Sequence, residues 1–140
     1  DRAQAKAIFS GECDNVLMNT YCFALMKFNS KKPEQKKWAK ATDVIFYNQG
    51  GRGQHINVSG GAIAKYSKNN EEAIRFLEWM TQPKAQKIYS EVNFEYPVNP
   101  KVKLGGKIME WGTFKADNLS ISEIAKNSKK AQMIIDKVGW

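Results

Sequence analysis

The chain has 140 residues, the usual length of a single domain, and no stretch approaches the roughly 18 consecutive apolar residues that a membrane-spanning helix needs. Its net charge of +8 would by itself suggest a nucleic acid or an anionic surface as partner. The lysines, however, are scattered along predicted helix faces apart from a run over residues 31–37, which lacks interleaved aromatics and is interpreted as a solvated loop and helix start. No DNA- or RNA-binding signature is present, so we expect no nucleic-acid partner.

The first elements alternate between helix and strand. A helical stripe of small and apolar residues ends at Gly11, and a short strand is predicted over residues 14–18. Asn19 or Thr20 then caps a helix that runs through Phe28. This helix–strand–helix order favours an α/β architecture with a parallel sheet.

The middle of the chain continues the same pattern. A proline begins a predicted helix over residues 33–40, and β-branched and aromatic residues predict a strand over residues 43–47. Residues 48–53 contain three glycines but fit neither a phosphate-binding P-loop nor a dinucleotide fingerprint, so a turn is the simpler interpretation. Short strands are expected over residues 55–58 and 61–65.

The C-terminal half is predicted to be mainly helical. Asn70 is the expected N-cap of a packed amphipathic helix, and Pro83 begins another. Proline restriction makes residues 96–100 extended ahead of a glycine loop at 105–106. Two final helices are expected over residues 122–126 and 129–137. The second should turn these apolar side chains inward: Ile134, Ile135 and Val138.

Tyr21 is the strongest candidate for a functional side chain. It lies in a polar turn that follows the predicted strand and opens a helix, a position at the mouth of an α/β cleft. A phenolate is a hard oxygen donor that suits ferric iron. Packing in the core or on the surface explains the other four tyrosines adequately.

The cysteines and the single histidine give no convincing enzyme or zinc site. Cys22 as nucleophile with His55 as base would need the two side chains in contact, and nothing in the sequence places them so, which favours a protein that is not an enzyme. Cys13 and Cys22 with one histidine do not complete a zinc site. An oxidising compartment would permit a disulfide between them, but the intervening strand favours two part-buried free thiols.

Several motifs in order resemble one family. The run from Gly11 ends in Asn-Thr-Tyr-Cys, and residues 48–60 look like the family's returning hinge segment. Residues 93–98 match a later segment of the family, and the closing Gly139–Trp140 is similar to its natural C-terminus. Together they resemble the ferric-iron-binding substrate-binding proteins of bacterial ABC transporters. In that family the strand ends in Asn-Thr-Tyr-Tyr, and both tyrosines coordinate the metal.

The resemblance implies an incomplete type II periplasmic-binding-protein fold. Residues 1–47 would be part of the second lobe, 48–66 a hinge crossing, and 67–140 a C-terminal helical part that packs on the first lobe. The chain begins inside a helical pattern without Met or an export signal, which is typical of the C-terminal part of a longer protein. Open sheet edges and uncovered helix faces would then favour a homodimer or strand exchange when the segment is isolated.

The resemblance also implies a site and its partners. Tyr21 would be a ligand of Fe3+ in a periplasmic protein that delivers iron to an ABC permease, with further ligands in the missing N-terminal part. Cys22 occupies the second tyrosine position, where a soft thiolate matches Fe3+ poorly, so it is either an altered ligand or no ligand at all. Asn19 corresponds to a residue that helps hold a synergistic anion.

A small basic module that binds nucleic acid or an acidic surface is the alternative of a different class. Salt separates the two hypotheses, because phosphate binding weakens steeply with ionic strength whereas chelation of a metal ion hardly does.

Overall fold

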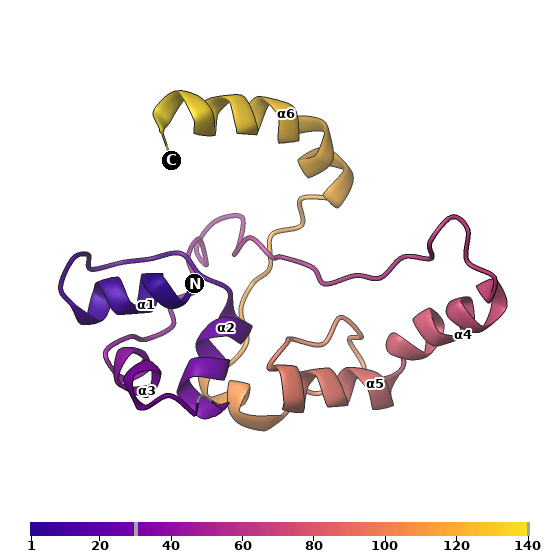
Figure 1. Ribbon diagram of the computed structural model, residues 1–140, viewed down its shortest axis with the longest axis horizontal. Coiled ribbons are helices and arrows are strands. Elements are labelled where there is room, and N and C mark those ends of the chain that lie inside the picture. The colour runs from indigo at the N-terminus through magenta and orange to yellow at the C-terminus, as the bar shows by residue number, and fades with distance from the viewer. Residues whose placement is uncertain (30, 140) are drawn as a thin grey trace. The chain divides into compact units, whose positions relative to one another are not determined.

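The computed structural model describes residues 1–29 and 31–139 (Figure 1). Six α-helices are formed in this part of the chain: α1 (Arg2–Phe9), α2 (Thr20–Ala24), α3 (Pro33–Lys40), α4 (Asn70–Met80), α5 (Pro83–Ile88) and α6 (Ile121–Val138). Three shorter helical turns accompany them: the π-helical turns η1 (Leu25–Asn29) and η2 (Tyr89–Asn93), and the 3-10 helix η3 (Gly106–Trp111). No described helix is both long and apolar enough to cross a bilayer. Trp140, part of the predicted C-terminal motif, lies outside the described residues.

The chain divides into two compact units. Unit 1 contains residues 1–45 and 57–113, and unit 2 contains residues 46–56 and 114–140.

The predicted α/β sheet is not confirmed. Within residues 1–29 and 31–139 the only strand-like pairing is an isolated parallel bridge between Gln54 and Ala116. The stretches predicted as strands, 14–18, 43–47, 55–58 and 61–65, contain neither helix nor ladder. A strand is held by hydrogen bonds to a neighbouring strand, and residue composition can favour extended backbone without supplying that neighbour.

Unit 1 is built on two small apolar clusters. The first joins α1, α2, η1 and α3 through Ala5, Phe23, Met26 and Ala39. The second contains Ala24, Phe94 and Ile108. Trp111 packs against both clusters, and its ring centroid lies 5.5 Å from that of Phe23. Full burial of a phenylalanine stabilises a fold by about 1.5–3 kcal/mol, so Phe23 and Phe94 are major anchors.

The helix predicted after the Tyr21 turn is confirmed, with Asn19 as its N-cap. It runs as α2 to Ala24 and continues as the π-helical turn η1 to Asn29. Phe23, Ala24 and Met26 are buried on its inner side. The two proline-initiated helices, α3 and α5, also begin where the sequence predicts them.

Helix α4 corrects two expectations. Its N-cap is Asn69, one residue earlier than predicted, because Asn70 already has helical geometry. The predicted packed face is buried only in part: Ile74 is 47% exposed, Ala73, Leu77 and Met80 are half-buried, and α4 contains no buried residue. The amphipathic pattern is real, but the described residues cover this face only in part.

Helix α6 is one continuous helix, whereas the sequence predicts two. It begins after Ser120, whose Oγ accepts a hydrogen bond from the Glu123 backbone N at 3.2 Å. Asn127 and Ser128, at the predicted break, donate instead to the helix's own carbonyls at Glu123 and Ala125. Of the predicted inward residues, Ile134 and Val138 are 53% and 67% exposed, whereas Ile135 is half-buried.

Unit 2 is held by what we call the clasp, the contact between residues 46–56 and 114–117. The Gln54 backbone N donates to Lys115 O and the Asp117 N donates to Gln54 O, both at 2.8 Å. Arg52 Nε lies 3.0 Å from the buried Asp117 Oδ2, an ion pair whose angles fall outside those of a hydrogen bond. Phe46 and Phe114 stack with ring centroids 4.5 Å apart. The glycine-rich stretch is therefore a turn, as predicted, but its backbone pairs with residues 115–117, which was not predicted from the sequence.

Candidate metal centre at the Tyr21 turn

Tyr21 is the second residue of α2 and 37% exposed. The helix is fixed by the burial of Phe23 and Ala24, which have 1% and 0% exposure. Phe23 is two positions further along, on the opposite side of the helix from Tyr21, so its burial leaves the Tyr21 phenol toward the surface. The predicted turn that opens a helix is present, while the strand expected before it is not formed.

The surroundings of Tyr21 favour the protonated phenol. A side-chain hydrogen bond with Cys22 and the negative charge of Cys22 are the main causes that raise its pKa above 10.0, followed by desolvation and the charge of Glu95. A metal that binds here must therefore displace a proton, so binding weakens as the pH falls. Tyr96 differs, because burial raises its pKa to about 12 and its hydroxyl donates to Gly112 O at 3.1 Å.

Cys22→Ser should lower the pKa of Tyr21. The substitution removes the sulfur that bonds the phenol and the negative charge that opposes phenolate formation. NMR titration of the Tyr21 ring carbon measures the change directly. Cys13→Ser is the matched control, because Cys13 is the other free, half-buried thiol and does not act on Tyr21. An unchanged pKa in Cys22→Ser would show that Cys22 does not control the phenol.

Asn19 forms side-chain hydrogen bonds with two residues from other parts of the chain. Its Nδ2 donates to Asp1 Oδ2, and its Oδ1 accepts from Asn57 Nδ2, both at 3.2 Å. Asn19 therefore joins the turn before Tyr21 to the start of α1 and to the segment that contains Asn57. Sequence reasoning missed both partners, because no local pattern reveals a pairing across 38 residues.

Glu95 is a second residue that sequence reasoning missed. It follows Phe94, which is 2% exposed and adopts a left-handed backbone with φ of 61°. This conformation is unusual for an aromatic residue, and the packing of its ring in the second cluster offsets the strain. Residues 93–98 are one of the motifs that carry the family resemblance, but nothing in them indicates that Glu95 acts on Tyr21.

Apart from Cys22, which is hydrogen-bonded to Tyr21, the remaining candidates add no recognisable metal-binding cluster among the described residues. Cys13 and Cys22 are free, half-buried thiols. His55 is exposed. Across the described ranges, no group of three or more His, Cys, Asp or Glu side chains could hold a metal ion. The turn thus offers one phenol with neighbouring thiol, amide and carboxylate groups, which is only part of a coordination set.

Comparisons with known proteins agree on one family. The model of the bacterial extracellular solute-binding proteins matches residues 24–116, more than half of the chain. Iron uptake protein A1 of Synechocystis is 38% identical over 140 residues, covering all of this chain and 39% of that protein. Iron uptake protein A2 of the same organism is 32% identical, covering all of this chain and 41% of that protein. The chain therefore spans about two fifths of the length of these curated relatives.

Solved structures give the same result. A Trichodesmium protein named IdiA or FutA, in complex with iron and citrate, matches with a TM-score of 0.91 and 43% identity, covering 100% of this chain and 44% of that one. The ferric binding protein from Campylobacter jejuni matches with a TM-score of 0.89 and 44% identity, covering 99% of this chain and 44% of that one. The backbone of this chain is thus part of the fold that these proteins share.

Proposed function

Since this chain belongs to the bacterial extracellular solute-binding proteins, we propose that it is the C-terminal segment of a periplasmic protein that captures Fe3+ and delivers it to an ABC permease. The observation that carries this proposal is the exposed Tyr21 phenol at the start of α2, in a backbone that matches ferric-binding proteins over 99–100% of its length. Solute-binding proteins capture their ligand without chemical conversion, so the proposal includes no enzymatic step.

We propose the type II arrangement of lobes for the parent protein. Residues 1–47 belong to the second lobe, residues 48–66 to the hinge crossing, and residues 67–140 to helices that pack on the first lobe. The exposed apolar faces of α4 and α6 support this assignment, because they are suited to burial against a missing N-terminal part. The extended stretches without ladder partners would likewise join a sheet whose other strands come from that part.

Tyr21 supplies the phenolate that binds Fe3+ in this proposal. A phenolate oxygen and a ferric ion are both hard, so the bond is strong enough to displace the phenol proton. Cys22 then occupies the altered ligand position. Its sulfur raises the pKa of the Tyr21 phenol and forms no strong bond to hard Fe3+. One amide hydrogen of Asn19 bonds Asp1, and in this proposal the second donates a hydrogen bond to a synergistic anion.

Comparing the 140-residue chain with its full-length parent tests this function. The chain alone should bind Fe3+ far more weakly, because one phenolate cannot replace a ligand set organised by two lobes. Competition with citrate, followed by the visible phenolate-to-iron absorption, measures the difference. Light scattering should show self-association of the isolated chain through its uncovered faces. Citrate-resistant iron binding by the chain alone would contradict the proposed division of ligands.

A further inference from the structure

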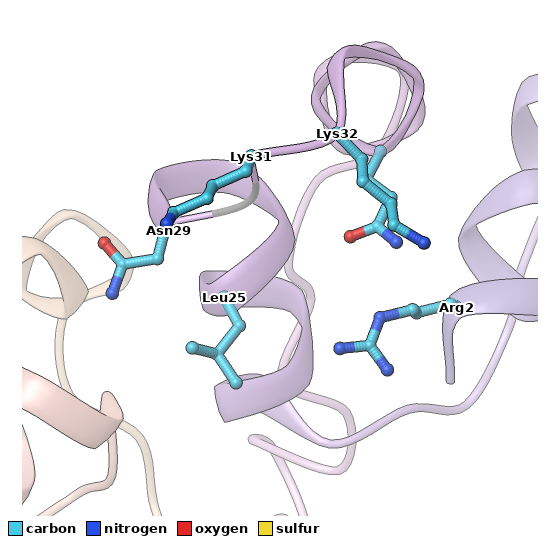
Figure 2. A pocket seen from close by; sticks show the side chains of 6 residues that line it. Arg2, Leu25, Asn29, Lys31 and Lys32 are labelled. Atoms are coloured by element: carbon cyan, nitrogen blue, oxygen red, sulfur yellow. The ribbon is translucent and has the colours of Figure 1, made fainter.

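A shallow hollow in unit 1 is lined by six residues from neighbouring elements (Figure 2). They are Arg2 of α1, Leu25 and Asn29 of η1, Lys31 in the loop before α3, Lys32 at the N-cap of α3, and Gln35 within α3. The residues of the Tyr21 turn, Asn19, Tyr21 and Cys22, are not among them. The hollow is therefore separate from the candidate metal centre, and a ligand could bind there whether or not the protein binds iron.

The lining of this hollow is positively charged. It contains three cations and no carboxylate. The nearest acids in the sequence, Asp1 and Glu34, do not line the hollow. Like charges around one space repel each other, and an anion between them would turn this repulsion into attraction.

The side chains offer complementary kinds of contact. Figure 2 shows the Arg2 guanidinium extending toward the space beside Leu25, with Lys32 reaching toward the same space from above. A guanidinium can hold two oxygens of one group, whereas an ammonium acts as a compact point charge. The amides of Asn29 and Gln35 add neutral N–H donors, and Leu25 supplies one apolar wall. Because these donors come from different parts of the lining, they suit a ligand with two anionic groups better than a single small ion.

We propose that the hollow binds a small polyvalent oxyanion of the pyrophosphate or polycarboxylate class. Arg2 of α1 and Lys32 at the N-cap of α3 reach toward the same space (Figure 2) and match the two negative groups of such a ligand, and Lys31 adds a further positive charge to the lining. The hollowed surface favours a compact free anion over a flat anionic surface.

Titration of the isotope-labelled 140-residue chain with inorganic pyrophosphate, in the absence of metal, tests the proposal. Amide resonances of Arg2, Asn29 and Gln35 should shift together and saturate. Arg2→Gln and Lys32→Gln should each weaken binding about fivefold, and the double variant should weaken it further. Lys36→Gln is the matched control, because Lys36 is an exposed lysine of α3 that does not line the hollow, and it should leave the affinity unchanged.

Four results would overturn the proposal. Shifts spread evenly over the basic surface would mean unspecific charge attraction, as would an equal loss of affinity in Lys36→Gln. Absence of saturable shifts at millimolar pyrophosphate would exclude the site. Attachment to vesicles rich in phosphatidylglycerol, with no response to free pyrophosphate, would assign the hollow to lipid headgroups instead. Retention of dispersed amide resonances in each variant separates lost binding from lost folding.

Discussion

Replacing Tyr21 with phenylalanine in the full-length protein should remove most of its ferric-iron affinity. The change deletes one oxygen atom and keeps the ring, so α2 should stay in place while the phenolate is lost. Residues that merely support a metal ligand cost about 10–100-fold in affinity when changed, and a direct ligand should cost more than that. Iron titration against citrate and the intensity of the charge-transfer absorption measure the loss.

Tyr66→Phe is the matched control for this experiment. Tyr66 is 85% exposed and is not among the residues that act on the Tyr21 phenol, so its hydroxyl should not affect iron. Unchanged iron binding after Tyr21→Phe would remove the site assignment and leave only the family and its fold.

Cys22→Tyr provides a further arm of the same experiment. The half-buried position either accepts a second phenolate, which raises the affinity, or is overpacked, which costs about 1–3 kcal/mol of stability without a gain in binding.

Gly53→Ala should open the clasp of unit 2. At this position φ is +105°, and an added Cβ would lie 2.7 Å from Lys115 O and from the carbonyl carbon and oxygen of Ala116. We expect about 1–3 kcal/mol of backbone strain and about 1 kcal/mol for each of the two backbone hydrogen bonds around Gln54. Hydrogen exchange at the Gln54 and Asp117 amides should accelerate by about two to four orders of magnitude.

Gly50→Ala is the control from the same turn. A Cβ at Gly50 would meet no atom within 4 Å, and its backbone is not left-handed. Exchange at Gln54 and Asp117 should therefore remain slow in this variant. Equal acceleration in the two variants would mean that general stiffening of the turn, and not the close approach at Gly53, opens the clasp.

The helices could be predicted where local residues decide them. Prolines begin α3 and α5 because their fixed φ suits a first helical position. The false break in α6 arose because Asn127 and Ser128 often end helices, yet both can also bond carbonyls one turn earlier. The predicted strands depended on neighbours that composition does not reveal, so their extended character could be expected but their pairing could not.

In the candidate site, too, the residues of one local motif could be predicted, whereas contacts between residues distant in sequence could not. Tyr21 and Asn19 belong to one short motif, and their place at the start of α2 is where the motif predicts it. Asn57 and Glu95 reach this turn only through tertiary structure, so their roles could not be read from the chain. The iron-binding role of Tyr21 itself stays a prediction until iron binding by the Tyr21→Phe protein is measured.

The clasp also constrains how the protein folds. Gln49 and Lys115 are 66 residues apart in sequence, and the Gln49 Oε1 accepts from the Lys115 backbone N at 2.7 Å. Closing so long a loop is entropically unfavourable unless the intervening chain has already become compact. The helices between them form from local contacts, which are faster than distant pairing. Unit 2 should therefore form late, after the segment that separates its two halves has collapsed.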